Sequence, residues 1–198
     1  NCSFEKIHLE NDKLDDFFNN DFGLFNGINV TIPFKSSVVK FLDTIDDEAK
    51  ILENVNCISK SNNMICGFNT DKYGFDMLLN ENGIEIEGSS CVVLGAGSSA
   101  KTVVKCLIEK GIGWIIIKNR SIDNARNIQN FAHSLGFNNI DLFNSNHASY
   151  DIAINTTPIG MYKEDSDNFF DIPIQDHTVL IDLIYTSKAV SYTHLRAH

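Results

Sequence analysis

Three polar clusters in the first part of the chain hold side chains that could carry chemistry. They are Asn29-Val30-Thr31-Ile32-Pro33-Phe34-Lys35, Asn54-Val55-Asn56 and Asn69-Thr70-Asp71. Together they offer one amine (Lys35), one carboxylate (Asp71), amides and hydroxyls, which are the partners that a polyhydroxylated ring needs. A lysine–carboxylate pair can also move a proton while a cofactor moves a hydride. The alternatives are a solvated surface charge for Lys35 and a helix N-cap for Asp71.

A glycine-rich turn points to a second kind of chemistry, the binding of a dinucleotide. Gly95-Ala96-Gly97-Ser98-Ser99-Ala100 fits the pattern G-x-G-x-x-[G/A] and stands between an apolar run and a helical pattern. Gly95 permits the tight turn, Gly97 lets the backbone approach a pyrophosphate, and Ala100 keeps the helix close to the strand. Free N–H groups at the start of the helix would bind the phosphates. The alternative is a glycine-rich turn without a ligand.

The residues after the second apolar run favour one cofactor over another. An NAD site places Asp or Glu at the end of that strand, where the acid bonds the ribose 2′-hydroxyl. Here the strand ends in Asn119-Arg120-Ser121, and the first acid is Asp123. A guanidinium can pair with a 2′-phosphate in a fork and stack on adenine, whereas a carboxylate would repel it. The pattern therefore favours NADP over NAD, with Ser121 as a further hydroxyl donor.

The elements that must position these residues fall into two α/β units, with a boundary near residue 85. In the first unit the expected strands are Ser3–Leu9, Gly27–Pro33, Asn54–Ser59 and Met64–Phe68, and the expected helices are Asp12–Phe18, Ser36–Leu42, Asp46–Asn54 and Lys72–Asn80. In the second unit the expected strands are Ser90–Leu94, Trp114–Lys118, Ile140–Phe143, Ile152–Asn155 and Val179–Leu183, with helices over Lys101–Lys110 and Ala125–Leu135. Strands that alternate with helices predict right-handed βαβ units and a parallel sheet.

Composition limits the classes of function. The chain has 198 residues, 43% of them hydrophobic, which is enough for a packed core. Its net charge of −10 repels phosphate backbones, so we expect a small-molecule substrate rather than nucleic acid. No apolar stretch reaches the ~18–20 residues of a membrane span, and no signal peptide is visible. The five cysteines lack the spacing of a zinc site, so we expect no metal, and reduced thiols in the cytoplasm.

Taken together, the motifs resemble those of the shikimate dehydrogenase family over about residues 3–186. The matching motifs are N-V-T-I-P-F-K (29–35), V-N (55–56), G-F-N-T-D-x-x-G (67–74), G-A-G-S-S-A (95–100), N-R-S (119–121), I-N-T-T-P-I-G-M (154–161) and D-L-I-Y (182–185). They stand in the family's order and close to its spacing. The first motif together with N-T-D is specific, whereas the glycine turn alone is not.

The resemblance implies reduction of 3-dehydroshikimate to shikimate with NADPH, in the chorismate pathway of aromatic amino-acid biosynthesis. It implies an α/β fold in which an N-terminal substrate domain (residues 1–84) and a Rossmann-like, doubly wound NADP domain (85–187) close over a cleft. Lys35 matches the catalytic lysine and Asp71 its carboxylate partner. The positions that match substrate contacts are Thr31, Asn56 and Tyr185. The positions that match cofactor contacts are Gly95, Ala96, Gly97, Ser98, Ser99, Asn119, Arg120, Ser121, Thr157, Pro158, Met161, Leu183 and, less closely, Asp47.

The chain also departs from the family pattern. No Ser-x-Ser segment precedes Ser3, and the family's glutamine is missing after Tyr185, so we expect a fragment that lacks both ends, with a tail of doubtful origin over residues 188–198. Asn124 stands where some members carry a second arginine, which would weaken NADP binding. Two other readings stay open: a quinate/shikimate dehydrogenase, and an NADP-binding fragment without turnover. We make no prediction of oligomeric state.

Overall fold

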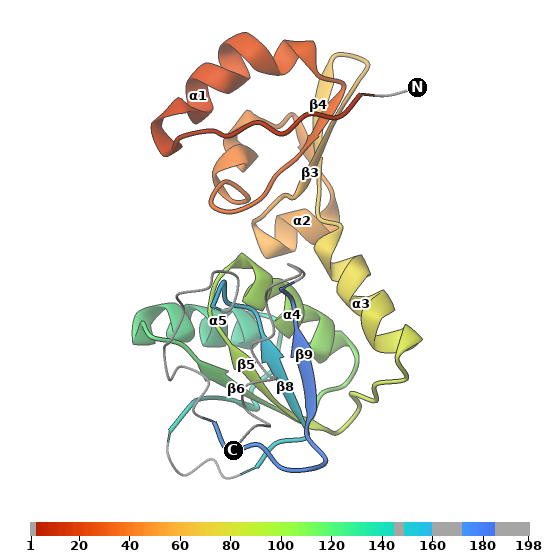
Figure 1. The fold of residues 1–198 in the computed structure, drawn as a ribbon, viewed down its shortest axis with the longest axis vertical. Helices are drawn as coiled ribbons and strands as arrows, with labels where there is room; N and C mark the ends of the chain where they lie inside the picture. The colour runs from red at the N-terminus through yellow and green to blue at the C-terminus, as the bar shows by residue number, and fades with distance from the viewer. Residues whose placement is uncertain (1–2, 145–148, 160–171, 185–198) are drawn as a thin grey trace. The chain divides into compact units, whose positions relative to one another are not determined.

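The computed structural model describes residues 3–144, 149–159 and 172–184, and the chain divides into two compact units (Figure 1). The first unit ends at Asp71 and the second begins at Lys72. This division lies earlier in the chain than the expected boundary near residue 85. The reason is that ion pairs tie helix α3 (Asp71–Glu81) to helix α4 (Ser98–Glu109) and its C-cap residue. Lys72 pairs with Glu109 at 2.5 Å, and Lys110 pairs with Asp76 at 2.7 Å. A boundary after residue 84 stays a proposal that the change in sequence pattern supports.

The first unit holds a four-stranded sheet in the order β1-β3-β4-β2. The strands are β1 (Gly27–Asn29), β2 (Thr44–Ile45), β3 (Cys57–Ser61) and β4 (Met64–Phe68). Strands β3 and β4 form the expected hairpin, whose turn residues Asn62 and Asn63 adopt positive φ angles of 50° and 61°. Asparagine tolerates that conformation, which suits a two-residue hairpin turn. Strand β2 pairs with β4 in parallel and was not expected, because two residues show no periodicity.

The first unit also contains helical segments. They are Asn11–Lys13, Leu14–Asp16 (α1), Phe17–Asp21, Phe22–Leu24, Ser37–Phe41 and Asp47–Leu52 (α2). The first four follow one another without a break and bury Leu14, Phe17 and Phe22 in the core of the unit. Helix α2 begins where expected, because the Asp46 side chain accepts a hydrogen bond from the Ala49 N–H at 2.7 Å.

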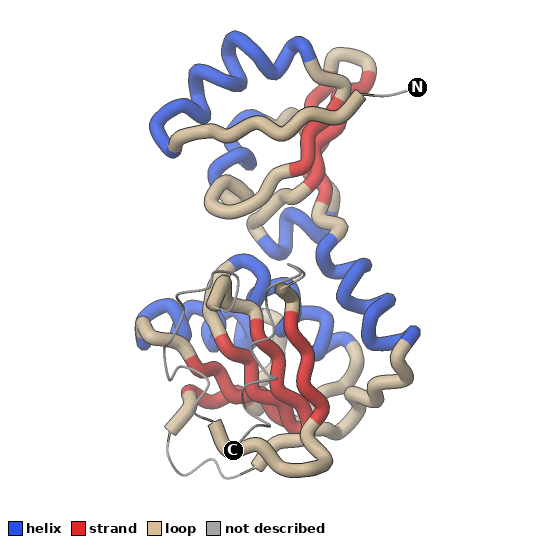
Figure 2. Tube along the Cα trace, viewed as in Figure 1, coloured by secondary structure: helices blue, strands red, loops and turns tan. Residues whose placement is uncertain are grey.

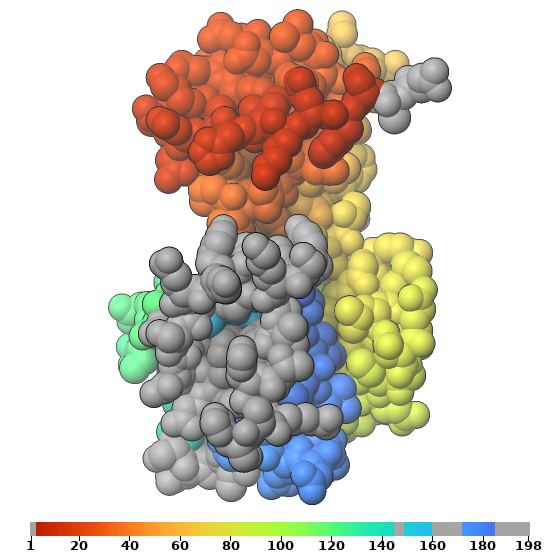
Figure 3. All heavy atoms as spheres, viewed as in Figure 1, coloured from red at the N-terminus to blue at the C-terminus, as the bar shows by residue number. Residues whose placement is uncertain are grey.

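Two expectations for the first unit were wrong. Residues Ser3–Leu9 form no strand, and they run across the surface of the unit, with Phe4 83% exposed (Figure 3). Their alternating pattern finds no neighbouring strand to pair with in the described residues. Strand β1 stops at Asn29 rather than Pro33. Beyond it, Val30 still donates to the Asn56 carbonyl at 2.8 Å, and the Ile32–Pro33 peptide bond is cis.

The second unit is a Rossmann-type α/β fold around a five-stranded parallel sheet, as the sequence predicts (Figures 1 and 2). Its strands are β5 (Ser90–Leu94), β6 (Trp114–Lys118), β7 (Ile140–Leu142), β8 (Ile152–Asn155) and β9 (Val179–Asp182), in the order β7-β6-β5-β8-β9. Helices α4 and α5 (Ile122–Ser134) cover one face. Strand β5 is buried on both faces, since Cys91 and Val93 join one core cluster and Val92 and Leu94 another.

The strand order reverses direction between β5 and β8. The chain runs outward from β5 through β6 to β7, then returns to the other side of β5 for β8 and β9. In open α/β sheets, ligands bind in the crevice outside the carboxyl ends of the strands at such a reversal. The glycine turn follows β5 directly, so the topology puts it at that place. No helix among the described residues has the length and apolar character to cross a membrane.

The carboxylate of Asp151 links the start of β8 to the start of β5. It accepts hydrogen bonds from the Ser90 backbone N–H and hydroxyl, both at 2.8 Å. The bond from the Ser90 N–H, and after it the bond from the hydroxyl, lower the pKa of Asp151 below its usual 3.8. The charge of nearby His177 acts in the same direction.

We expect Asp151→Asn to remove a stabilisation that depends on pH. Because the folded pKa is lowered, the carboxylate stabilises the native chain fully above about pH 4, and this contribution is lost as the pH falls through the folded pKa. The urea midpoints of the native and variant chains should therefore differ less at about pH 3 than at about pH 6. A difference for Asp151→Asn that stays constant with pH would contradict the prediction.

Candidate active site

The first unit brings Lys35 and Asp71 into an ion pair, although they lie 36 positions apart in the chain. The Lys35 Nζ donates to Asp71 Oδ2 in a short contact. The lysine side chain is 13% exposed and the aspartate 36%, so the pair is partly shielded from water. The Lys35 backbone carbonyl accepts from the Val55 N–H at 2.7 Å, which ties the segment after β1 to the segment before β3. This pair is the best candidate for proton transfer in the described part of the chain.

Asn56 holds the other oxygen of the Asp71 carboxylate. Its Nδ2 donates to Asp71 Oδ1 at 2.7 Å and to Thr70 Oγ1 at 2.9 Å. Its Oδ1 accepts from the Thr70 N–H at 2.9 Å. Both carboxylate oxygens therefore accept from side chains outside helix α3, one from an amine and one from an amide. This arrangement fixes the carboxylate in one orientation beside Lys35.

Two buried asparagines support this network and were not predicted as site residues. Asn69 Nδ2 donates to Asn54 Oδ1 at 2.5 Å, and Asn54 Nδ2 donates to the Leu52 carbonyl at 3.1 Å. Asn69 Oδ1 in turn accepts from the Asp71 N–H at 3.0 Å. Buried amides need such partners, and here they shape the turn that leads into α3. The signal available in the sequence was that each asparagine opens one of the polar clusters.

The two remaining predicted residues of the first unit are exposed. Thr31 lies in the turn after β1, where its carbonyl accepts from the Phe34 N–H at 2.9 Å. Asp47 is the first residue of α2. Their predicted contacts with substrate and cofactor stay predictions. Met161, Tyr185 and residues 188–198 lie outside the described residues.

The glycine turn of the second unit has the backbone that a dinucleotide site requires. Gly95 adopts a φ of +109°, and a Cβ there would lie 2.6 Å from Thr156 Oγ1 and 2.9 Å from Thr157 Cγ2. Gly97 is the N-cap of α4, and a Cβ there would meet open space. Open space above the first N–H groups of a twelve-residue helix fits a pyrophosphate. The residues present therefore fit the predicted cofactor.

The Asn119–Ser121 segment lies beside this turn. The Gly95 N–H donates to the Lys118 carbonyl at 2.8 Å, so the end of β6 adjoins the glycine turn. Asn119 Nδ2 donates to the Ser121 carbonyl at 2.9 Å, and Ser121 Oγ accepts from the Asn124 N–H at 3.3 Å as the N-cap of α5. The Ser121 hydroxyl can still donate, and the Arg120 side chain is exposed. Both remain suited to bind a 2′-phosphate.

The segments that follow β8 and β9 meet at one buried asparagine, Asn155, which was not predicted. Thr157 and Pro158 lie in the loop after β8, and Leu183 packs partly buried against the core just after β9. Asn155 hydrogen-bonds Thr157 through its side chain and Leu183 through its carbonyl, at 3.1 Å for the latter. The feature of the sequence that could have indicated a role for Asn155 is its position as a polar residue at the end of an apolar strand.

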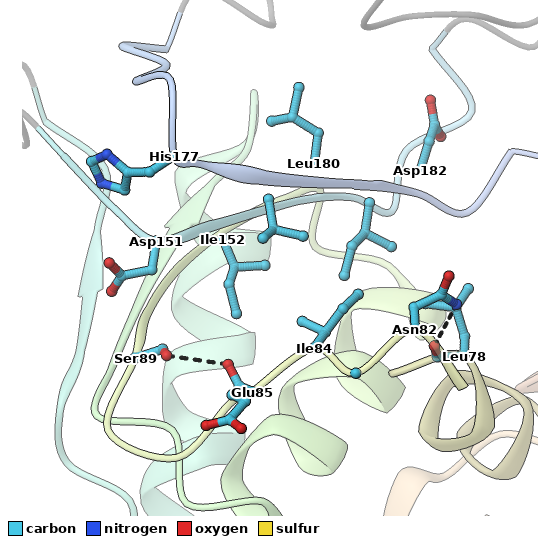
Figure 4. Close-up of a pocket in the computed structure, with 13 residues that line it drawn as sticks. Leu78, Asn82, Ile84, Glu85, Ser89, Asp151, Ile152, His177, Leu180 and Asp182 are labelled. Atoms are coloured by element: carbon cyan, nitrogen blue, oxygen red, sulfur yellow. Dashed lines mark hydrogen bonds between the residues drawn. The ribbon is translucent and has the colours of Figure 1, made fainter. Parts of the chain in front are cut away.

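A groove of about 740 Å³ in the second unit is separate from these residues (Figure 4). Leu78, Ile84, Ile152 and Ile181 supply apolar side chains to it, and none of the residues predicted for substrate or cofactor lines it. Ser89 donates to the Glu85 carbonyl and Asn82 to the Leu78 carbonyl, so these polar groups serve the local backbone. Within the ranges that the structure describes, no group of three His, Cys, Asp or Glu side chains could hold a metal ion.

Two family models match the chain. Residues 1–58 match the shikimate dehydrogenase substrate binding domain, and residues 78–183, more than half of the chain, match the model described as shikimate / quinate 5-dehydrogenase. The two matches follow the order of the two structural units.

Known proteins of this kind are similar over most of the chain. A shikimate dehydrogenase (NADP(+)) of Clostridium beijerinckii is 38% identical over 84% of this chain and 60% of its own length. A crystal structure of shikimate dehydrogenase from Aquifex aeolicus is 30% identical, with a TM-score of 0.78 over 91% of this chain and 66% of that one. A shikimate dehydrogenase in complex with NADP+ is also 30% identical, with a TM-score of 0.79 over 89% of this chain and 64% of that one. The chain spans about three fifths of the length of the first curated relatives that it matches.

Proposed function

The chain belongs to the shikimate dehydrogenase family, and from this we propose that it takes part in the NADPH-dependent reduction of 3-dehydroshikimate to shikimate, in aromatic amino-acid biosynthesis. The observation that carries the proposal is the Lys35–Asp71 ion pair with Asn56 on its second oxygen. It joins three residues of the family's substrate-side motifs. The substrate is a small molecule, and neither nucleic acid nor membrane has a part in the proposal.

Reduction of a ketone needs a proton on the oxygen and a hydride on the carbon. NADPH, when bound, supplies the hydride. We assign the proton to the Lys35 ammonium, which donates it to the carbonyl oxygen and takes it back in the reverse reaction. Asp71 holds the ammonium in place through their ion pair. Asn56 keeps the carboxylate oriented, and with Thr31 and Tyr185 it would bind the substrate hydroxyls.

For the cofactor we propose two groups of residues. The turn Gly95-Ala96-Gly97-Ser98-Ser99 would bind the pyrophosphate through its N–H groups, and Asn119, Arg120 and Ser121 would bind the adenosine 2′-phosphate. Thr157, Pro158, Met161 and Leu183 would lie by the nicotinamide, and Asp47 is a weaker candidate for the same ligand. The open space at Gly97 and the exposure of the Arg120 side chain support this assignment. A relative of known structure is in complex with NADP+.

A cytoplasmic setting with reduced thiols is part of the proposal. The four cysteines that the structure describes are free, and burial raises the pKa of Cys91 and, to about 11, that of Cys106. Such thiols are protonated at neutral pH and react slowly. They support a chain that folds without disulfide bonds.

The test is a spectrophotometric assay of the reduced nicotinamide band with four combinations: shikimate or quinate, each with NADP+ or NAD+. We expect the highest rate with shikimate and NADP+. A higher rate with quinate, or with NAD+, would favour a quinate/shikimate dehydrogenase, which the description of the matching family model also includes. Thermal stabilisation by NADP+ without turnover would favour the non-catalytic fragment. If the chain shows no turnover and no thermal stabilisation by NADP+, the proposal is overturned.

A further inference from the structure

The amide of Asn155 uses its entire hydrogen-bonding capacity inside the second unit. Its side chain is fully buried at the carboxyl end of β8. The Nδ2 donates to Asp182 Oδ1 at 3.1 Å and to the Ile159 carbonyl at 3.3 Å. The Oδ1 accepts from the Thr157 N–H at 2.9 Å and from its hydroxyl at 2.7 Å. Two donors and two acceptors are the most that an amide offers, so no other common side chain could replace it in full.

Asp182 anchors this amide from the neighbouring strand. It is the register partner of Asn155 across the β8–β9 pair. Its Oδ1 also accepts from the Ile184 N–H at 3.0 Å, so it shapes the exit of β9 as Asn155 shapes the exit of β8. In Figure 4 the Leu180 and Asp182 side chains stand on one side of β9, while Ile84 lies on the other side. Asp182 also lines that groove, whereas Asn155 does not.

The loop that Asn155 shapes packs on the glycine turn. Thr156 Oγ1 donates to the Leu94 carbonyl at 2.8 Å, and the Thr156 and Thr157 side chains are the atoms that a Cβ at Gly95 would strike. Thr157 Oγ1 also accepts from the Ile159 N–H at 3.1 Å, which closes the loop. The loop thus stands at the reversal of strand order between β5 and β8, where the dinucleotide crevice is expected.

We propose that Asn155 is a positioning residue of the dinucleotide site, with Asp182 as its anchor. It sets the shape of the Thr157–Ile159 loop and, through its carbonyl, the position of Leu183, and both lie on the nicotinamide side of the proposed site. The inference rests on the proposed function for the identity of the ligand, NADP, and for the placement of its nicotinamide end. An asparagine that merely stabilised the core would affect binding of every part of the ligand through loss of fold. A positioning residue should affect the nicotinamide end alone.

The experiment measures binding of two ligands by calorimetry. One is NADP+, and the other is adenosine 2′,5′-bisphosphate, which lacks the nicotinamide end. In Asn155→Asp both donors are lost and a carboxylate faces Asp182, so we expect the Kd for NADP+ to rise about tenfold or more. We expect the Kd for the adenosine fragment to stay within about twofold. The matched control is Asn139→Asp, which removes a 3.1 Å bond to the Gly113 carbonyl at the opposite end of the sheet and should leave both Kd values unchanged.

Rescue by exchange sharpens the test. In Asn155→Asp combined with Asp182→Asn, the amide and the carboxylate trade places. An amide again donates between β8 and β9, while Thr157 and Ile184 still find a side-chain oxygen to accept from them. We expect the double variant to regain most of the lost NADP+ affinity. Equal losses for both ligands in Asn155→Asp, unchanged binding of NADP+, or no recovery on exchange would each overturn the inference. If Asn155→Asp fails to fold, the same binding measurements on Asp182→Asn and on the double variant test whether Asn155 is a positioning residue.

A second readout needs no ligand. Hydrogen exchange of the Thr157 N–H should be faster in Asn155→Asp than in the native chain, because repulsion between the carboxylates at 155 and 182 would move the acceptor away from this N–H. It should be unchanged in Asn139→Asp. If the native chain binds neither nucleotide, the proposed function fails and this exchange decides whether Asn155 shapes the loop. Equal exchange in the native chain and in Asn155→Asp would overturn that role whatever the ligand.

Discussion

Replacing Lys35 with alanine is expected to lower kcat for shikimate oxidation about 10²–10⁴-fold, the range for a lost general acid–base group. The lysine holds the only amine in the described Lys35–Asp71–Asn56 network, so no other side chain of that network can donate the proton. Steady-state rates with shikimate and NADP+ measure the effect, and the Kd for NADP+ should stay nearly unchanged, because Lys35 belongs to the other unit.

Lys35→Arg separates charge from proton transfer. A guanidinium keeps the positive charge beside Asp71, but it stays protonated throughout the accessible pH range. We expect kcat to remain low while KM for shikimate rises less than in Lys35→Ala. Recovery of activity in Lys35→Arg would mean that charge alone is needed.

Lys40→Ala provides a matched control. Lys40 pairs with Asp15 at 2.8 Å in the same unit, but the two side chains are 57% and 63% exposed. Exposed pairs contribute little to stability, so we expect kcat near the native value. A loss in Lys40→Ala as large as that in Lys35→Ala, or near-normal turnover in Lys35→Ala, would refute the proposed role of Lys35.

Arg120→Ala is expected to raise the Kd for NADP+ about 10–100-fold and the Kd for NAD+ by less than about twofold. This range corresponds to the loss of hydrogen bonds to a charged group, about 1.5–3 kcal/mol. NAD+ lacks the 2′-phosphate and so lacks the group that the guanidinium would bind. Titration of both dinucleotides against the native and variant chains measures the difference.

Two further variants refine the Arg120 test. Arg120→Lys keeps the charge but not the fork, so we expect a Kd between those of the native and alanine chains. Arg126→Ala removes an arginine one turn into α5, which pairs with Asp123 at 3.5 Å, and should alter neither Kd. Equal weakening of NADP+ and NAD+ in Arg120→Ala would rule out the 2′-phosphate assignment.

The second unit shows how far local pattern alone can go. Strands β5, β6 and β8 begin and end at the residues predicted from the apolar runs. A parallel strand that is buried on both faces is apolar at every position, and such a run can be read without knowing its neighbours. Helices α4 and α5 were predicted too, though each begins about three residues earlier than expected, at its serine or isoleucine start.

The first unit shows where local pattern fails. Ser3–Leu9 alternates like a strand and is not one, while β2 is a strand of two residues without a pattern. A short strand exists only through its partner, and β2 depends on hydrogen bonds to β4, some 20 residues further on. The periodicity of the sequence around β2 does not indicate which strand it pairs with.

The same distinction applies to the site. The sequence alone determined the chemical groups: an amine and a carboxylate in specific motifs, a glycine turn between strand and helix, and an arginine where an NAD enzyme would carry an acid. Only the tertiary structure decided that Lys35, Asp71 and Asn56 share one network, and that Asn155 and Asp182, 27 positions apart, join the exits of two strands. The physical reason is the distance along the chain over which each effect acts. Backbone propensity and apolar periodicity act over a few residues, whereas the partner of a buried polar group is chosen by the packing of whole elements.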